Sequence, residues 1–142
     1  MKIVLANGVF DILHYGHLLH LLEARTMGDM LIVSVTEDEH VNKGPGRPIN
    51  ALEQRMAILR ALKCVGMVIS TPCAITAILR VKPDIFVKGI DYAGGDKFSE
   101  DVARACAKVG AEIRYTQTPK MSVTEDIIAK TKEIAYGHLQ SS

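Results

Sequence analysis

Residues 7–17 read Asn7-Gly8-Val9-Phe10-Asp11-Ile12-Leu13-His14-Tyr15-Gly16-His17 and lie between two apolar runs, residues 3–6 and 18–22. The first run is typical of a buried strand and the second of a helix, so this stretch should form the turn between them. A helix N-terminus offers unpaired N–H groups and the positive end of the helix dipole, which together favour a phosphate. His14 and His17 stand at this turn and can donate hydrogen bonds to the same anion. The stretch therefore predicts a strand–turn–helix unit that handles a nucleotide.

Apolar, β-branched runs alternate with helical patterns along the rest of the chain. The expected strands cover residues 2–6, 30–35, 67–70, 84–87 and 111–115. The expected helices include residues 18–25 and 56–63 and cover about 74–81, 99–109 and 123–135. This alternation predicts an α/β fold, a single Rossmann-like domain whose parallel five-stranded sheet has helices on both faces. We assign residues 1–136 to this domain and residues 137–142 to a flexible tail.

Three helix starts carry local signals. Asn50-Ala51-Leu52-Glu53 resembles a capping box, and Ser122-Val123-Thr124-Glu125 forms a second one. Thr71-Pro72 predicts a cap followed by proline at the first helical position.

The composition is that of a globular protein. The chain has 142 residues, of which 48% are hydrophobic and 23% charged, and a net charge of +1. No broad basic surface follows from that charge, so a nucleic acid is not an expected partner. Cys64, Cys73 and Cys106 are too widely spaced for a metal motif and odd in number, which favours reduced thiols. No signal peptide or membrane-length apolar run is visible, and the default expectation is a cytoplasmic protein without a membrane partner.

Two polar, glycine-containing segments, residues 36–49 and 88–98, follow expected strands. Ligands bind at the carboxyl edge of open α/β sheets, so both segments are candidate binding loops. Lys43 and Arg47 in the first segment would close over a triphosphate, with an ordinary solvated loop as the alternative.

In the second segment, Lys88 would suit a phosphate and Asp91 a ribose hydroxyl or an acceptor. Gly89 would let the backbone pass close to a base. Ordinary turn residues are the alternative for all three.

Four motifs in chain order resemble the cytidylyltransferase-like nucleotidyltransferase superfamily, over roughly residues 2–134. His14-Tyr15-Gly16-His17 is its HxGH signature, and Ser122-Val123-Thr124 falls where its second phosphate motif lies. Arg47-Pro48-Ile49-Asn50-Ala51-Leu52-Glu53-Gln54-Arg55-Met56 and Lys88-Gly89-Ile90-Asp91-Tyr92 are similar to the adenylyltransferase domain of ADP-heptose synthase. Many relatives have threonine in place of Val9, but the ADP-heptose-type relatives also resemble Gly-Val-Phe-Asp at this turn.

This resemblance implies that a phosphate of an acceptor attacks the α-phosphate of a nucleoside triphosphate and that pyrophosphate leaves. The residues implied to be catalytic are His14, His17, Lys43 and Arg55. Those implied to bind the nucleotide are Gly8, Val9, Phe10, Gly16, Lys88, Gly89, Asp91, Lys120, Ser122 and Thr124. Those expected to contact the acceptor are Asp11, Asp38 and Arg47. Mg²⁺ is expected with the triphosphate and needs few protein ligands.

Several of these residues have a structural alternative. The histidine pair would otherwise cap a helix, and Arg55 would form a surface ion pair with Glu53 or a neighbour. Asp11 would orient the turn, or hold Mg²⁺ through water, and Ser122 would serve as an N-cap. The other histidines, which lack the motif, are expected to be structural or solvated: His20, His40 and His138.

The leading function is transfer of an adenylyl group from ATP to a sugar 1-phosphate, with a heptose 1-phosphate suggested by the resemblance. The alternative is a CTP-dependent cytidylyltransferase acting on a polyol or amino-alcohol phosphate. The chain is also similar to glycerol-3-phosphate cytidylyltransferases, but these carry an arginine where it has Gln117 and Thr118. A regulatory module that binds a nucleotide without turnover is the non-enzymatic alternative. A homodimer is expected by resemblance alone.

Overall fold

The computed structural model describes residues 1–89, 97–117 and 123–140, in which strands and helices alternate. The strands are β1 (Ile3–Gly8), β2 (Met30–Thr36), β3 (Met67–Thr71), β4 (Ile85–Gly89) and β5 (Glu112–Thr116). The helices are α1 (Tyr15–Arg25), α2 (Leu52–Arg60), α3 (Ala74–Val81), α4 (Lys97–Val109), α5 (Val123–Gln140) and the short 3-10 helix η1 (Asp38–His40). The five strands form one parallel sheet in the order β3-β2-β1-β4-β5. The Rossmann-like α/β fold expected from the sequence is confirmed.

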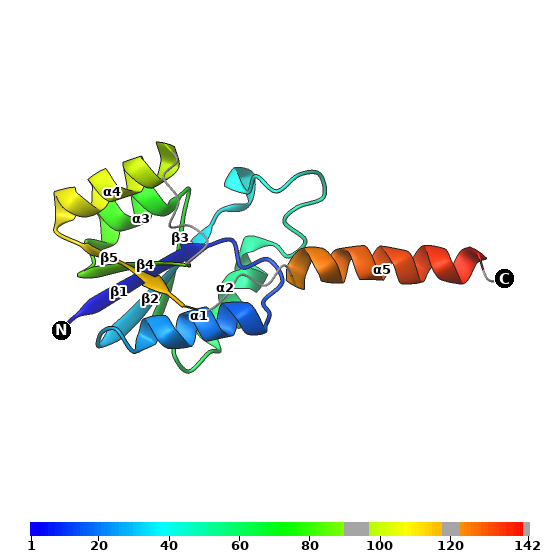
Figure 1. Cartoon of the computed structure of the whole chain (residues 1–142), viewed down its shortest axis with the longest axis horizontal. Coiled ribbons are helices and arrows are strands. Elements are labelled where there is room, and N and C mark those ends of the chain that lie inside the picture. Colours follow the sequence, from blue (N-terminus) through cyan, green and yellow to red (C-terminus); the bar gives the residue numbers. More distant parts are fainter. Residues whose placement is uncertain (90–96, 118–122, 141–142) are drawn as a thin grey trace.

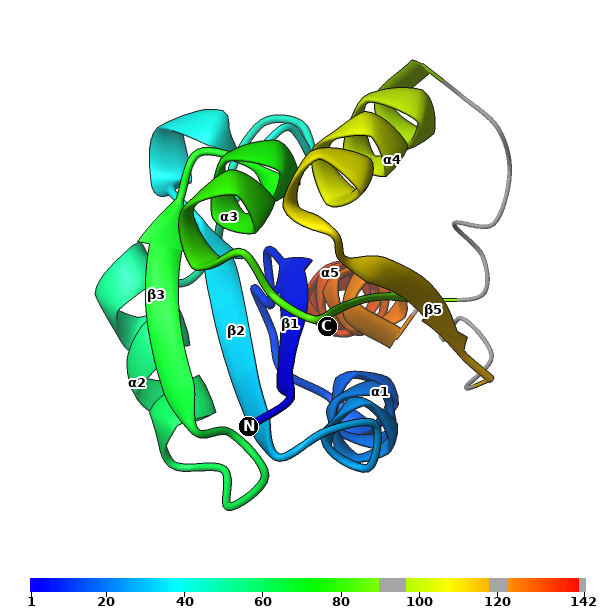
Figure 2. The same ribbon diagram turned by 90° about the vertical axis from the view of Figure 1, so that its left-hand side faces the viewer.

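Helices cover both faces of the sheet, with α1 and α2 on one face and α3 and α4 on the other (Figure 2). A hydrophobic core lies on each face of the sheet. Because successive side chains of a strand point to opposite faces, β1 contributes residues to both cores. Val4 and Ala6 pack with Leu21 of α1 and Leu59 of α2, whereas Leu5 packs on the opposite face against α3 and α4. β1 is therefore the central strand and is buried on both sides, which explains its unbroken apolar run.

The strand order reverses at β1, because β2 pairs with one edge of it and β4 with the other. The loops that follow β1 and β2 lie at the same end of the sheet, toward the right in Figure 1. Such a reversal leaves a crevice at the carboxyl ends of the strands, where open α/β folds bind their ligands. The β1–α1 turn, residues 9–14, stands at this point.

Two of the expected helix caps are wrong. The N-cap of α2 is Ala51, and the Asn50 amide instead donates to the carbonyl oxygen of Asp11 at 2.7 Å. Helix α3 begins at Ala74 with Cys73 as its N-cap, because Thr71 still belongs to β3. The third expected cap, at Ser122, lies outside the described residues.

Helix α5 extends away from the sheet (Figure 1) and continues to Gln140. The sequence predicts the end of this helix near residue 135 and a tail from residue 137, whereas the observed helix includes Gly137. One glycine costs a helix only about 1 kcal/mol relative to alanine, which does not end it. No helix in the described part of the chain is both long and apolar enough to cross a membrane.

Candidate functional site

The β1–α1 turn contains a strained backbone. Phe10 has a φ of 50°, a left-handed conformation that an aromatic residue rarely adopts. Its buried ring lies against Gly8, where a Cβ atom would come within 2.9 Å of the ring. Gly8 thus makes room for Phe10, a packing role that adds to the nucleotide contact predicted for this glycine.

His14 and His17 are held together at the first turn of α1. His14 is the N-cap, and its Nδ1 accepts the N–H of Gly16 at 3.0 Å. The Nδ1 of His17 accepts the N–H of His14 at 3.3 Å. The two rings stack with their centroids 3.8 Å apart, and the Phe10 ring meets the His17 ring in a T-shaped contact at a centroid distance of 5.3 Å. Each ring is therefore fixed by the backbone and by its neighbours.

These hydrogen bonds also select the tautomer of both histidines. An Nδ1 atom that accepts an N–H carries no proton, so a neutral ring must carry its proton on Nε2. His14 and His17 thus each present an Nε2–H donor beside the positive end of the α1 dipole. Two N–H donors at a helix N-terminus suit a phosphate or another anion.

Asp11 belongs to this turn, and its buried carboxylate binds the segment before α2. Its carboxylate accepts the N–H groups of Ile49 and Asn50, both at 2.9 Å, and the Nε–H of Arg47 at 2.7 Å. Burial raises the pKa of the carboxyl, but these donors outweigh it and the pKa lies below its ordinary value. Asp11 is only 3% exposed and pairs with Arg47, and the contact with an acceptor that the sequence predicts for these two residues stays a prediction.

Arg55 lies in the protein interior. Its side chain has no exposed surface, and its guanidinium donates to three backbone carbonyl groups and to the Asp38 carboxylate. The surface ion pair with Glu53 is absent from this arrangement. A direct contact with a phosphate would require Arg55 to leave these partners, and an acceptor contact by Asp38 would compete with Arg55.

The remaining expected residues are more scattered. Lys43 is exposed in the loop between η1 and α2, whereas Lys88 and Gly89 end β4 at the carboxyl edge, with Lys88 Nζ 3.4 Å from Ser99 Oγ. Thr124 lies in the first turn of α5, and its side chain is not among those described. The expected residues that lie outside the described part of the chain are Asp91, Lys120 and Ser122.

For one polar residue of the site the sequence predicts no functional role. Asn7 precedes Gly8 at the end of β1, and its Oδ1 is the buried side-chain oxygen that lacks a partner among the described residues. A buried acceptor without a donor is destabilising. This residue could have been recognised from the sequence as a candidate for the site, because it is an amide at the end of an otherwise apolar strand.

Helix α1 also holds the end of β5. His20 Nδ1 lies 2.7 Å from Thr116 Oγ1, and the Glu23 carboxylate accepts the N–H of Gln117 at 2.8 Å. Burial lowers the pKa of His20 and Glu23 opposes this, with a net lowering. The structural role expected for His20 agrees with these contacts.

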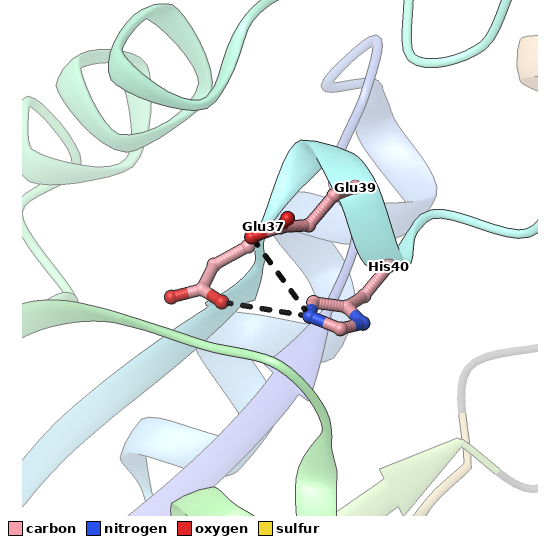
Figure 3. Close-up of side chains that lie close together, drawn as sticks. All are labelled: Glu37, Glu39 and His40. Carbon is pink, nitrogen blue, oxygen red and sulfur yellow. Dashed lines mark ion pairs between the residues drawn. The ribbon is translucent and has the colours of Figure 1, made fainter.

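The carboxylates described at this edge, those of residues 11, 37, 38 and 39, are poorly placed for a resident metal ion. Asp11 and Asp38 are both paired with arginines. Glu37, directly before η1, gathers with Glu39 and His40 of that helix (Figure 3), and their ligand atoms lie within 4.8 Å of one another. Glu37 is half-buried, whereas Glu39 is 78% exposed, and exposed ion pairs of this kind contribute little stability. The N–H donors of the β1–α1 turn suit an anion rather than a cation. A metal ion at this site would therefore be expected to arrive already bound to a triphosphate.

Comparisons with known proteins agree with this geometry. The model of the family described as cytidylyltransferase-like matches residues 5–134. Bifunctional protein HldE of Pseudomonas syringae pv. syringae is 44% identical over 135 residues, which cover 92% of this chain and 28% of that protein. HldE of Azotobacter vinelandii is 43% identical with the same coverage. The chain therefore spans little more than a quarter of these relatives.

Solved structures show the same fold. The lipopolysaccharide core biosynthesis protein from Thermoplasma volcanium is 31% identical, with a TM-score of 0.68, covering 86% of this chain and 99% of that one. Pantoate-beta-alanine ligase from Francisella tularensis has a TM-score of 0.59 at 18% identity, covering 85% of this chain and 60% of that one. The second likeness concerns the fold alone.

Proposed function

Because the chain belongs to the cytidylyltransferase-like family, we propose that it transfers a nucleoside monophosphate from a nucleoside triphosphate to a phosphorylated acceptor, with release of pyrophosphate. One observation carries this proposal: His14 and His17 stack at the N-terminus of α1 with both rings fixed as Nε2–H donors. The pair stands at the carboxyl end of the central strand, where the strand order reverses.

The reaction needs positioning and charge neutralisation. An oxygen of the acceptor phosphate attacks the α-phosphorus, and the bond from that phosphorus to the oxygen bridging to the β-phosphate breaks. The bridging oxygen leaves with the electron pair as part of pyrophosphate. Negative charge grows on the transferring and leaving phosphates, where the Nε2–H groups of His14 and His17 and the α1 dipole would stabilise it. The substrate is the magnesium complex of the triphosphate, whose charge Mg²⁺ partly neutralises.

We propose ATP as the nucleotide and a sugar 1-phosphate resembling heptose 1-phosphate as the acceptor. The support is the 44% identity with HldE and the resemblance of residues 47–56 and 88–92 to an ADP-heptose synthase domain. Lys43 would close over the triphosphate, and Lys88 would contact a phosphate at the carboxyl end of β4.

The test measures pyrophosphate release with ATP and with CTP. Each nucleotide is combined with heptose 1-phosphate, a hexose 1-phosphate, glycerol 3-phosphate and an amino-alcohol phosphate. Release with ATP and heptose 1-phosphate, well above every other pair, is the expected result. A preference for CTP with glycerol 3-phosphate would replace the substrate assignment, and nucleotide binding without release from any pair would favour a regulatory module.

A further inference from the structure

The left-handed backbone at Phe10 requires support from its surroundings. A strained conformation of this kind persists only where neighbouring groups over-determine it. The carbonyl group of Val9, directly before Phe10, accepts a hydrogen bond from Arg55 Nη1 at 2.8 Å. The turn that precedes the two histidines is thus tied to helix α2, 46 positions later in the chain.

Arg55 connects three segments through one planar group. The same Nη1 donates to the carbonyl of Thr36 at 2.8 Å, and Nε donates to the carbonyl of Asn50 at 3.0 Å. The ends of β1 and β2 and the start of α2 therefore converge on one guanidinium. Arginine supplies several donors in a fixed plane, whereas lysine has three donors on a single atom and cannot reach all of these acceptors in the same geometry.

The contact with Val9 determines where a backbone donor points. The Val9–Phe10 peptide is trans and planar, so its carbonyl and the Phe10 N–H point in opposite directions. With the carbonyl bound to Arg55, the Phe10 N–H is directed away from the guanidinium. Rotation of this peptide would break the hydrogen bond with Arg55 and turn the N–H inward.

The charge of Arg55 is compensated at its outer end. Asp38 pairs with Nη2, and its carboxylate also accepts the N–H of Leu52 at 3.3 Å. Asp38 is 48% exposed while the Arg55 side chain is fully buried. A buried cation is tolerated only with such a partner and with its N–H groups satisfied.

We propose that Arg55 is a positioning residue for nucleotidyl transfer: through the Val9 carbonyl it orients the Phe10 N–H and fixes the turn that leads into His14 and His17, without contacting substrate. This inference rests on the proposed function for its catalytic consequence. Its geometric part, control of the turn by Arg55, is independent of the reaction and is measured separately.

The kinetic experiment uses Arg55→Lys and Arg55→Met, with Arg60→Met as the matched control on the exposed surface of the same helix. In the Arg55 variants kcat should fall by about 100-fold, the size of effect that misplacement of a catalytic group produces, while KM for ATP changes by only a few-fold. The control should keep wild-type values. A rise in KM with unchanged kcat would overturn the proposal, because it would indicate a direct contact with the nucleotide.

The second readout is taken without any ligand. We expect the amide resonance of Phe10 and the ring ¹⁵N resonances of His14 and His17 to shift in the Arg55 variants and to stay in place in Arg60→Met. If the Arg55 variants do not fold, Asp38→Asn weakens the outer ion pair and should move the same resonances by a smaller amount. Unchanged resonances in a folded Arg55 variant would overturn the proposal.

The two readouts separate this inference from the proposed function. Shifted resonances in a protein that transfers no nucleotide would remove the proposed function and leave the control of the turn by Arg55 standing. Transfer by the wild type, together with unchanged resonances and unchanged kcat in Arg55→Lys, would leave the proposed function standing and overturn the inference about Arg55.

Discussion

At the residue scale, His14 and His17 combine a structural and a chemical task. Their Nδ1 atoms accept backbone N–H groups at the start of α1, and their Nε2 atoms carry the donors proposed to act on the phosphates. Replacing either ring therefore removes a donor from the site and a hydrogen bond from the helix terminus. The catalytic loss should be much larger, because one such backbone bond contributes only about 1 kcal/mol.

His17→Ala should lower kcat for pyrophosphate release by about 100- to 1,000-fold, the effect of removing one transition-state donor, with a small change in KM. The domain should remain folded, with a modest fall in Tm. His40→Ala is the matched control, since His40 is 47% exposed on η1 and should leave kcat unchanged. A fall in activity that simply follows the loss of folded protein would show a structural histidine instead.

Asp11 predicts a pH dependence of stability. Its pKa is lowered in the folded protein, so its ionised form stabilises the fold above the ordinary pKa of 3.8. That stabilisation is lost as the pH falls through the lowered, folded-state pKa. In urea unfolding between pH 5 and pH 2.5, the free energy of unfolding should therefore fall more steeply for wild type than for Asp11→Asn. Parallel curves for the two proteins would contradict this assignment.

At the scale of elements, burial explains which sequence signals were reliable. The strands could be predicted because both faces of a parallel sheet are covered, which demands continuous apolar runs such as residues 3–6 and 31–33. The cap expected at Asn50 failed because its amide instead bonds to Asp11, a residue 39 positions away. Likewise, the interior position of Arg55 depends on carbonyl groups from three segments, which no local pattern reveals.

The N-terminus of α3 gives a further prediction at this scale. Burial raises the pKa of the Cys73 thiol, but the Thr76 hydroxyl and the N–H groups of Thr76 and Ile75 outweigh it, and the pKa is lowered. Burial raises the pKa of the other two thiols, Cys64 and Cys106. At neutral pH, iodoacetamide should therefore label Cys73 first.

Peptide mass spectrometry measures this labelling directly. Thr76→Val removes the hydroxyl that lies 3.5 Å from the Cys73 sulfur and should slow the reaction. Equal labelling rates at all three cysteines would contradict the prediction.

At the scale of the whole molecule, the order of strands and helices could be predicted, whereas the placement of α5 could not. Alternating β and α segments with right-handed crossovers allow few arrangements, and the observed sheet is one of them. The sequence predicts a helix over residues 123–135 without indicating its place, and in the structure α5 extends from the sheet, with Ile134 66% exposed. The helical pattern of a segment reports its amphipathicity and says little about which surface it meets.

Helix α5 should therefore be the least protected helix in amide hydrogen exchange. Among its described side chains only Ile128 is partly buried and the others are exposed, and a helix of 18 residues with so little packing is only marginally stable in water. The amides of residues 126–135 should exchange much faster than those of β1, as followed by mass spectrometry at low protein concentration. Protection equal to that of β1 would show that another surface covers α5, as in the homodimer expected by resemblance.

The hydrogen bonds to the two Nδ1 atoms also bear on the stereochemistry of the reaction. In an Nε2–H imidazole, the lone pair able to attack phosphorus is on Nδ1, and in His14 and His17 a backbone N–H already occupies it. Neither ring is then available to carry the nucleotide as a phosphoramidate. In the proposed reaction the acceptor phosphate would then displace pyrophosphate in a single in-line step, and a substrate chiral at the α-phosphorus should give product of inverted configuration.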